Sequence, residues 1–271
     1  MIYKHIEWFY YQGALLPKSP PHKEIILSKK EERELLQKSK ALFLRYTKGW
    51  DREEGRFWYV IKDKFNGFEE LSSNTRSKVR RGLKHSIVKK VSNITIAKEG
   101  YTVYKEAFRN YVTIKKPLDE ERYKQEIYNA KEDDFWAVYC EGKLIAYSQN
   151  RIEEESVNYA IIKFHPQYLK IYPSYALFYT MNQYYLKEKQ CLYVNDGARS
   201  ISHETNIQDF LIDKFKFRKS FVILCIAYRW DIALIIKLLY PFRNIIKKIE
   251  VIFLKKISIL LYQEEIRRSY E

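Results

Sequence analysis

A polar stretch in the last third of the chain carries the residues best suited to chemistry. It follows a β-prone run, 192–194, and precedes a helix with apolar periodicity, 207–215. Polar groups at the end of a buried strand are where open α/β sheets usually place their active sites. Capping of the following helix is the alternative interpretation. The stretch contains two carboxylates, an imidazole and a guanidinium: Asp196, Arg199, His203 and Glu204.

These side chains suit proton transfer and anion binding. We predict that His203 or Glu204, and after them Asp196, acts as the general base, because an imidazole titrates near neutral pH and burial raises a carboxyl pKa. Arg199 could hold an anionic donor or acceptor through paired hydrogen bonds, or could bridge to Asp196. Asn206 is expected to contact the substrate. The histidines lack metal-binding spacing and no GxSxG motif occurs, so we expect neither a metal site nor a serine nucleophile.

Composition indicates a basic globular protein. The 271 residues are 46% hydrophobic, enough for one large domain or two small ones, and the formal net charge is +15. Such a charge favours an anionic partner, such as nucleic acid, anionic lipid or a phosphorylated cofactor, although it also fits simple solubility. Three cysteines without CxxC spacing predict reduced, buried thiols and a cytoplasmic protein. The N-terminus lacks a signal-peptide pattern. The chain has no long uncharged apolar run, so no membrane-spanning helix is expected.

The most basic segment is 72–91, which has seven cationic side chains and no acidic one. Val79, Leu83 and Ile87 recur every four residues, so the segment is predicted to be a helix with one buried stripe. Arg76 and Arg80 then lie on an adjacent flank with Lys84 and could contact phosphates of the substrate. A solvated basic face is the alternative.

The remaining pattern predicts a mixed sheet with helices, an α+β fold. Residues 41–46 and 56–62 are expected to form a hairpin around Gly49 and Gly55, and Ser28 to cap a helix. Further strands are expected over 93–98, 135–140, 143–150, 156–164 and 221–228, with helices over 103–112, 119–131 and 173–189. Three parts are predicted: 1–70 with N-terminal strands and a helix, 71–230 as the main domain, and 231–271 as a helical tail.

The order of elements from 134 to 228 resembles the catalytic half of the GNAT acetyltransferase superfamily. Two segments are more similar to the Fem-type branch. They are the basic motif Ser77-Lys78-Val79-Arg80-Arg81 and the closing segment from Phe210 to Phe217. The resemblance covers roughly residues 70–228 and rests on pattern order more than on one motif. It implies an acyl-CoA N-acyltransferase fold, with an N-terminal extension and a C-terminal amphipathic tail.

The resemblance also implies where a donor lies. In that superfamily the strand matching 156–164 splays from the strand matching 192–194, and an acyl-CoA lies in the wedge with its pyrophosphate at the start of the next helix. Donor-binding residues are therefore expected at Ile162, Lys163, Phe164, Ser174 and Tyr175. The family's phosphate loop, [QR]-x-x-G-x-[GA], falls on Leu169, Tyr172 and Ser174, so a tyrosine replaces its glycine.

The implied function is transfer of an acyl group, such as acetyl, from acyl-CoA to an amine of a small molecule or sugar. Because some Fem-type members use aminoacyl-tRNA as donor, aminoacyl transfer with tRNA contacts along 72–91 is the second hypothesis. A binding module of the same fold without catalysis is the third.

The tail differs from the rest of the chain. Between 231 and 271 long apolar side chains alternate with basic pairs, and Pro241 separates two helical pieces. This pattern suits a helix on an anionic membrane surface, which would place the protein peripherally at the inner membrane. Packing on the main domain, or on a second copy in a homodimer, explains the pattern equally well.

Overall fold

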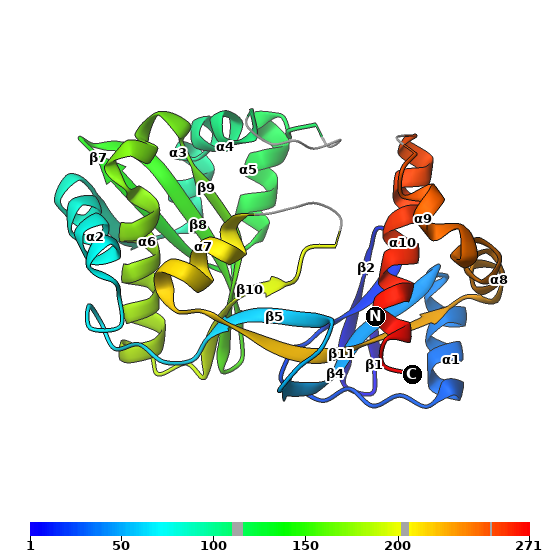
Figure 1. Cartoon of the computed structure of the whole chain (residues 1–271). Helices are drawn as coiled ribbons and strands as arrows, with labels where there is room; N and C mark the ends of the chain where they lie inside the picture. The colour runs from blue at the N-terminus through cyan, green and yellow to red at the C-terminus, as the bar shows by residue number, and fades with distance from the viewer. Residues whose placement is uncertain (110–115, 202–205, 250) are drawn as a thin grey trace. The chain divides into compact units, whose positions relative to one another are not determined.

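The computed structural model describes residues 1–109, 116–201, 206–249 and 251–271, with the backbone alone described at 252 and 253. Contacts divide the chain into two compact units (Figure 1). Unit 1 comprises Met1–Tyr59, Ala198–Asn206 and Lys219–Glu271. Unit 2 comprises Val60–Gly197 and Ile207–Arg218.

Unit 1 is built on strands in the order β1-β2-β3-β4-β11. The β3 and β4 strands are parallel and the other pairs are antiparallel. The predicted hairpin between 41–46 and 56–62 is wrong, because β4 pairs with β11 and not with β5. Gly49, with φ +67°, lies inside β4 where its register with β11 shifts, so the glycine marks a bulge and not a turn. The strands are β1 (Ile2–Tyr3), β2 (Ile6–Tyr11), β3 (Ala14–Lys18), β4 (Phe43–Arg52) and β11 (Arg218–Tyr228), and β5 (Phe57–Lys62) lies beside β11 in the strand order.

Helices cover both faces of this sheet. Helix α1 (Lys29–Ser39) begins with the predicted capping box: Ser28 Oγ accepts from Glu31 N at 3.3 Å, and the Glu31 carboxylate accepts from Ser28 N at 2.7 Å. Leu35 and Leu36 of α1 join the core on one face, while α10 (Ile252–Arg268) contributes Ile266 to the core on the other. The tail also forms α8 (Trp230–Leu239), η3 (Tyr240–Phe242) and α9 (Arg243–Ile246), so Pro241 does separate helical pieces.

Unit 2 contains a mixed sheet in the order β10-β9-β8-β7-β6. Only β9 and β10 are parallel. The predicted hairpin at 135–150 is confirmed, and both turn residues, Glu141 and Gly142, have the positive φ of a tight hairpin turn. The strands are β6 (Ile87–Val91), β7 (Asp134–Cys140), β8 (Lys143–Glu153), β9 (Ser156–Phe164) and β10 (Tyr193–Ala198).

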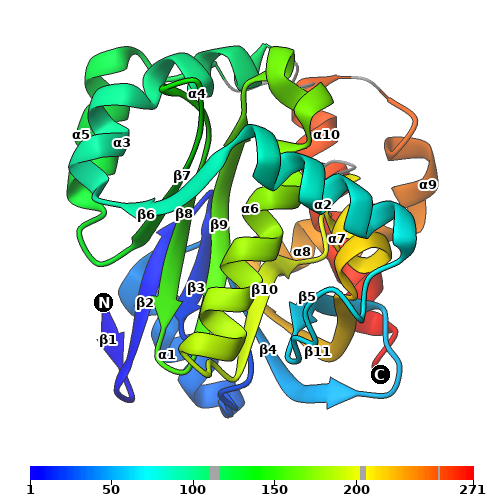
Figure 2. The same ribbon diagram turned by 90° about the vertical axis from the view of Figure 1, so that its left-hand side faces the viewer.

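Two helical layers enclose the sheet of unit 2 (Figure 2). On one face α3 (Asn93–Glu99), α4 (Tyr101–Phe108) and α5 (Glu120–Asn129) pack around Ile96, Val103 and Tyr123. On the other face lie α2 (Ser73–His85), α6 (Pro173–Asn182) and α7 (Asn206–Phe215). The segment η1 (Pro166–Ile171) precedes α6, and a π-helical turn, η2 (Gln183–Glu188), follows it.

Two predicted elements near 72–98 are wrong. The predicted helix ends at His85 and is followed by β6, while the predicted strand 93–98 is helix α3. Ser92 explains the second error, because its Oγ accepts from Thr95 N at 3.2 Å and caps α3. The buried residues of α2 are Thr75, Val79 and Gly82, whereas Leu83 and Ile87 are exposed.

Candidate active site

The two parallel strands of unit 2 separate part-way along their length. Pairing between β10 and β9 ends at Asn195 and Asn158. Both strands continue beyond this pair, β9 to Phe164 and β10 to Ala198, without pairing with each other. The Asn195 side chain closes the last pair, since its Nδ2 donates to Val157 O at 3.2 Å. A wedge with unpaired backbone groups of β9 therefore opens next to Asp196.

Asp196 is the first residue past that last pair. It is half-buried. Burial raises its pKa to about 7, although a hydrogen bond from the Gln208 side chain acts to lower the pKa. Gln208 Nε2 also lies 3.5 Å from Asp196 O, which ties α7 to the end of β10. A carboxylate that gains and loses a proton near neutral pH is suited to general base catalysis.

Most backbone N–H groups at the start of α6 are already hydrogen-bonded within the chain. Pro173 has none, and Tyr172 O accepts from both Tyr175 N and Ala176 N. In η1 the N–H groups of Tyr168 and Tyr172 are also bonded to the backbone. Within the described residues Ser174 N has no partner, so it is the one N–H of this turn left for a ligand. Tyr172 itself has φ +62°, the left-handed conformation that glycine favours.

Helix α2 reaches this turn through a glycine. A Cβ at Gly82 would lie 2.5 Å from Tyr172 O and 3.1 Å from the Ala176 Cβ, so the two helices approach each other closely. This contact places Lys78 Nζ 5.6 Å from the centre of the Tyr172 ring and the Arg81 guanidinium 5.4 Å from it. Two cations thus stand beside the start of α6.

The predicted donor-binding residues lie around the same region. Ile162, Lys163 and Phe164 are half-buried in β9 beyond its last pair with β10, and pair on their other side with β8. Ser174 is half-buried and Tyr175 is buried in the first turn of α6.

The predicted substrate-binding cations of α2 are Arg76 and Arg80. The exposed Arg80 stacks over the Phe68 ring at 5.1 Å, and Arg76 is half-buried. The cations that contact the start of α6 are Lys78 and Arg81, which the sequence reasoning missed. Gly82 could have indicated them, because a glycine within a helix allows close approach of another element. The face of α2 that carries Gly82 is therefore the face that packs inward.

Of the other predicted site residues, the structure describes Arg199 and Asn206. Arg199 lies in unit 1, where its Nη1 donates to Arg56 O at 2.6 Å and its Nη2 to Tyr262 Oη at 2.8 Å. Asn206 is exposed at the first position of α7. His203 and Glu204 lie outside the described residues.

A buried polar network, also missed, supports the far end of α6. Tyr185 Oη accepts from Trp136 Nε1 at 2.9 Å and from Asn150 Nδ2 at 3.2 Å, and donates to Asp134 Oδ2 at 3.0 Å. Tyr185 lies in the π-helical turn, which places its hydroxyl among these groups. The network anchors α6 to β7 and β8 and so holds the helix in place.

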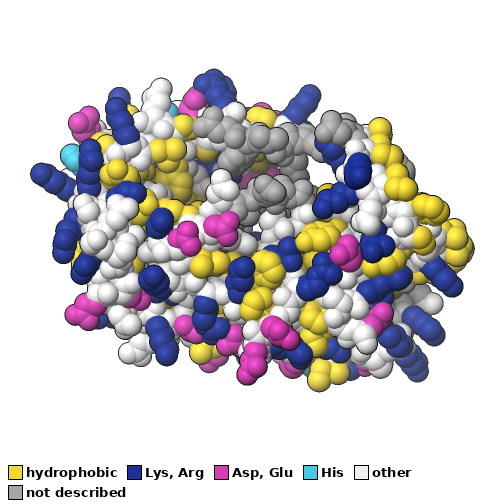
Figure 3. All heavy atoms as spheres, viewed as in Figure 1, with side chains coloured by type: hydrophobic (Ala, Val, Ile, Leu, Met, Phe, Trp, Pro, Cys, Tyr) yellow, Lys and Arg dark blue, Asp and Glu magenta, His cyan; other side chains and the backbone are white. Residues whose placement is uncertain are grey.

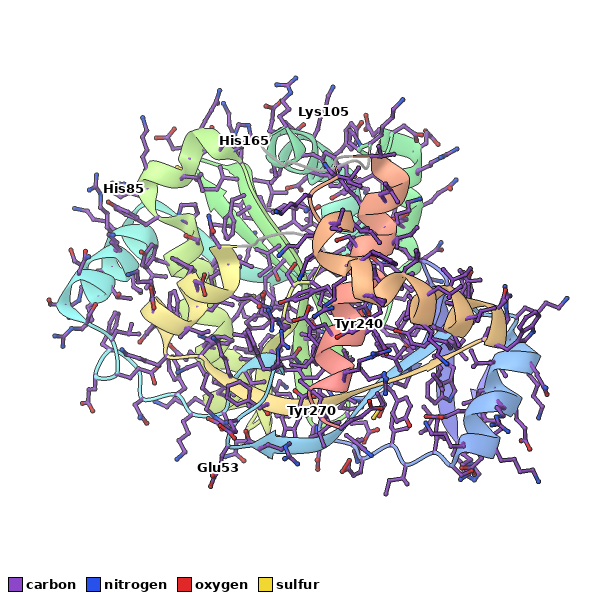
Figure 4. All side chains as sticks on the ribbon, turned by 45° about the vertical axis from the view of Figure 1, so that its right-hand side comes forward. Glu53, His85, Lys105, His165, Tyr240 and Tyr270 are labelled. Carbon is purple, nitrogen blue, oxygen red and sulfur yellow. The ribbon has the colours of Figure 1, made fainter. Side chains whose placement is uncertain are left out.

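Metal binding finds no support within the described part of the chain, where no cluster of His, Cys, Asp and Glu could hold an ion. Figure 4 shows His85 at the end of α2 and His165 after β9, on different elements. Cys140, Cys191 and Cys225 are half-buried free thiols.

Comparison with known proteins identifies the fold. No family model and no curated protein sequence matches the chain. Three solved structures match with a TM-score of 0.54. L-PGS from Bacillus licheniformis is 14% identical, with 97% of this chain and 86% of that chain covered. FemX is 10% identical over 79% of this chain and 81% of that one. The C-terminal domain of a protein assigned as a lysylphosphatidylglycerol synthetase from Agrobacterium fabrum is 12% identical, over 86% and 83%.

The chain has a GNAT-like fold of the Fem type. The resemblance seen in the sequence is thereby confirmed as a resemblance of fold. At these identities the likeness shows the fold alone.

Proposed function

We propose that the protein is an acyltransferase that moves an acyl or aminoacyl group from a phosphate-bearing carrier to an amine. The observation that carries this proposal is the position of Asp196. A carboxylate with a pKa of about 7 stands at the point where β9 and β10 separate. The unpaired backbone of β9 offers N–H and C=O groups to an extended donor.

Asp196 acts as the general base in this proposal. The acceptor amine loses its ammonium proton to the Asp196 carboxylate, and its nitrogen attacks the carbonyl carbon of the donor. The bond from that carbon to the carrier oxygen or sulfur then breaks, and the carrier leaves with a proton as a hydroxyl or thiol. General base catalysis contributes roughly 10²- to 10⁴-fold, so Asp196→Asn is expected to lose activity by that factor.

The donor that the geometry favours is aminoacyl-tRNA. Since the start of α6 leaves one free N–H, a pyrophosphate cannot be held by several backbone amides as in a glycine loop. Side-chain cations stand there instead. Helix α2 has no acidic residue, and within the described residues Arg76, Lys78, Arg80, Arg81 and Lys84 form no ion pair. Figure 3 shows Lys and Arg side chains gathered where α2 lies. Such a row suits a nucleic-acid backbone.

Acyl-CoA is the second candidate, and Tyr172 favours it. Its left-handed backbone keeps the conformation that the family's glycine would supply, and the adjacent Ser174 N–H is free to donate. Lys78 and Arg81 could then hold the phosphates of CoA.

Two binding titrations separate the donors. We expect a pool of aminoacylated tRNA to bind with an affinity that falls steeply with salt. Charge reversal at Arg76, Lys78 and Arg81 together should reduce the slope of log K against log salt by about 2 to 3. Reversal of Lys98, Lys105 and Lys131, exposed on other elements, is the matched control. Binding of acetyl-CoA but not of tRNA would favour the second candidate.

Transfer of label from the bound donor to a pool of small amines and amino sugars tests the chemistry itself. Asp196→Asn should bind the donor as the wild-type chain does and lose transfer. Full transfer by this variant would refute the role of Asp196, and no binding of either donor would leave a non-catalytic binding module as the better account.

The tail supports a contact with an anionic membrane surface. Trp230, Leu234 and Leu238, spaced four apart on α8, are 79%, 53% and 62% exposed, and Phe242 and Ile245 continue this apolar surface. Opposite side chains pack inward, in a cluster with α10 around Ile236, Ile246 and Leu261. Figure 3 shows hydrophobic side chains on the surface at α8.

The positive charge around the apolar surface of α8 favours an anionic membrane as its binding partner. From 232 to 249 the chain has four cations and no acid. An anionic bilayer surface offers headgroups for the lysines and acyl chains for the apolar residues. No helix in the described ranges is both long enough and apolar enough to cross a membrane.

Vesicle pelleting of the full chain tests this contact. Vesicles with anionic lipid should retain the wild-type chain, neutral vesicles should not, and Leu234→Gln with Leu238→Gln should abolish retention. The paired control is Ile26→Gln with Ile94→Gln, which removes exposed apolar groups elsewhere. A dimer that dissociates in the α8 variant, without vesicle binding, would assign the surface to a second copy.

A further inference from the structure

Unit 1 contains a cationic pocket that the proposed function does not use. The cavity has a volume of about 90 Å³ and is partly open to solvent. Its lining comes from β3, β4, the loop after β3, the start of β5, Ala198 and Leu224. Two lining side chains are cationic, Lys23 and Arg45, and none is acidic.

Arg45 stands on an apolar face of the sheet. Along β4, Leu44 and Tyr46 face the core beneath α1, whereas Phe43 faces the core that α10 covers. Because side chains alternate along a strand, Arg45 shares the face of Phe43. It pairs across to Ile226 of β11, a residue of the same core. A guanidinium is therefore placed among buried hydrophobic groups.

No carboxylate neutralises Arg45 within the described residues. Its Nη1 donates to Gln263 Oε1 at 3.1 Å, and a guanidinium has five N–H donors. The buried carboxylate of α10, Glu264, is paired with Arg267 at 2.8 Å and Arg268 at 2.7 Å. Burial lowers the pKa of Arg45, and the neighbouring Tyr59 and Tyr11 phenols oppose that effect. Arg45 is half-buried, and a charge partly removed from water without a counter-ion is costly, so an anion at this position would stabilise unit 1.

We propose that this pocket binds a small carboxylate, with Arg45 holding the carboxylate group. Guanidinium and carboxylate form paired hydrogen bonds of matching geometry. Thr47 and Tyr59 add hydroxyls, whose oxygens lie 3.5 Å apart, and Pro17, Pro20 and Phe57 supply apolar walls. These walls favour a carboxylate with a short hydrocarbon part over inorganic phosphate. A cavity that binds benzene measures about 150 Å³, so this smaller one suits a chain of about two to four carbons.

Thermal unfolding of the full chain with sodium acetate, propanoate and butanoate tests the proposal. We expect a saturable rise in Tm, of about 4 °C or more at roughly thirty times the dissociation constant. Sodium chloride at matched ionic strength and propan-1-ol should each fail to produce it. An equal rise with chloride would refute the carboxylate site and indicate a general salt effect.

Arg45→Met removes the charge and keeps most of the side-chain length. It should abolish the carboxylate-dependent rise without lowering the Tm of the ligand-free protein, because the displaced charge had no counter-ion. Arg52→Met, at the exposed end of the same strand, should retain the rise. A rise that survives Arg45→Met would overturn the proposal.

A second variant covers the case in which Arg45→Met does not fold. Ser19→Leu fills the pocket from the loop after β3 and leaves Arg45 in place. The carboxylate-dependent rise should be lost here too, and saturation-transfer NMR should show no contact with butanoate protons. Persistent binding in this variant would place the ligand outside the pocket.

Discussion

Replacement of Asp196 by asparagine should stabilise the protein at neutral pH and leave it unchanged in acid. The folded chain holds this carboxyl with a pKa of about 7, raised by burial from 3.8. A raised carboxyl pKa means that folding favours the neutral form. The stabilisation is complete below pH 3.8 and is lost as pH rises through about 7. Asparagine has nearly the same shape and stays neutral throughout.

The size of the effect follows from the two pKa values. The difference between about 7 and 3.8 corresponds to about 4 kcal/mol, at ~1.4 kcal/mol per pH unit. Because the side chain is only half-buried, solvent screening reduces this value, and about 2 to 4 kcal/mol is expected. The variant should therefore gain that much unfolding free energy over the wild type between pH 4 and pH 8.

Urea unfolding of both chains across this pH range measures the difference directly. Asp213→Asn, an exposed carboxylate on α7, is the control and should leave the profile unchanged. Parallel pH profiles of the wild type and Asp196→Asn would refute the environment assigned to Asp196, and with it the argument for a base tuned to neutral pH.

Three further changes test how unit 2 is held together. Gly82→Ala should destabilise by about 1 to 3 kcal/mol, since its Cβ would meet Tyr172 O at 2.5 Å, although alanine favours helices. Glu70→Gln should cost about 3 to 5 kcal/mol, because it leaves Lys62, 2% exposed and paired to Glu70 at 2.9 Å, without its counter-ion. Tyr185→Phe should cost about 2 to 4 kcal/mol by removing a hydroxyl that is bonded to the buried Trp136 and Asn150 and to the half-buried Asp134.

Two of these changes have matched controls. Ser77→Ala lies on the exposed face of α2 and should be neutral or slightly stabilising. Joint replacement of Lys62 and Glu70 by Met and Leu should restore most of the loss. Denaturant unfolding measures all of them, and a stable Gly82→Ala protein would contradict the close approach of α2 to α6.

The strongest local signals in the sequence predicted the corresponding elements. Glu141-Gly142 between two alternating runs specified a hairpin, and Ser28 with Glu31 specified a helix start, because each signal acts through the backbone nearby. The order of elements then indicated the fold, which the solved structures support.

Errors arose where a residue's role depends on distant neighbours. Gly49 is a turn former in isolation but lies in a bulge, because β11 takes the place beside β4 that a hairpin partner would fill. Val79, Leu83 and Ile87 share a helical spacing, yet the inward face of α2 is set by contact of Gly82 with Tyr172. The raised pKa of Asp196 likewise depends on burial, which no sequence spacing reveals.

We propose that an acyl carrier lies between β9 and β10 against the start of α6. Hydrogen-exchange mass spectrometry of the full chain, with aminoacylated tRNA and separately with acetyl-CoA, tests it most directly. We predict slower exchange at 159–164 and 174–176 with at least one donor, and loss of this protection in the chain with Lys78→Glu and Arg81→Glu. Unchanged exchange at both segments with both donors, or protection confined to other segments, would contradict the account.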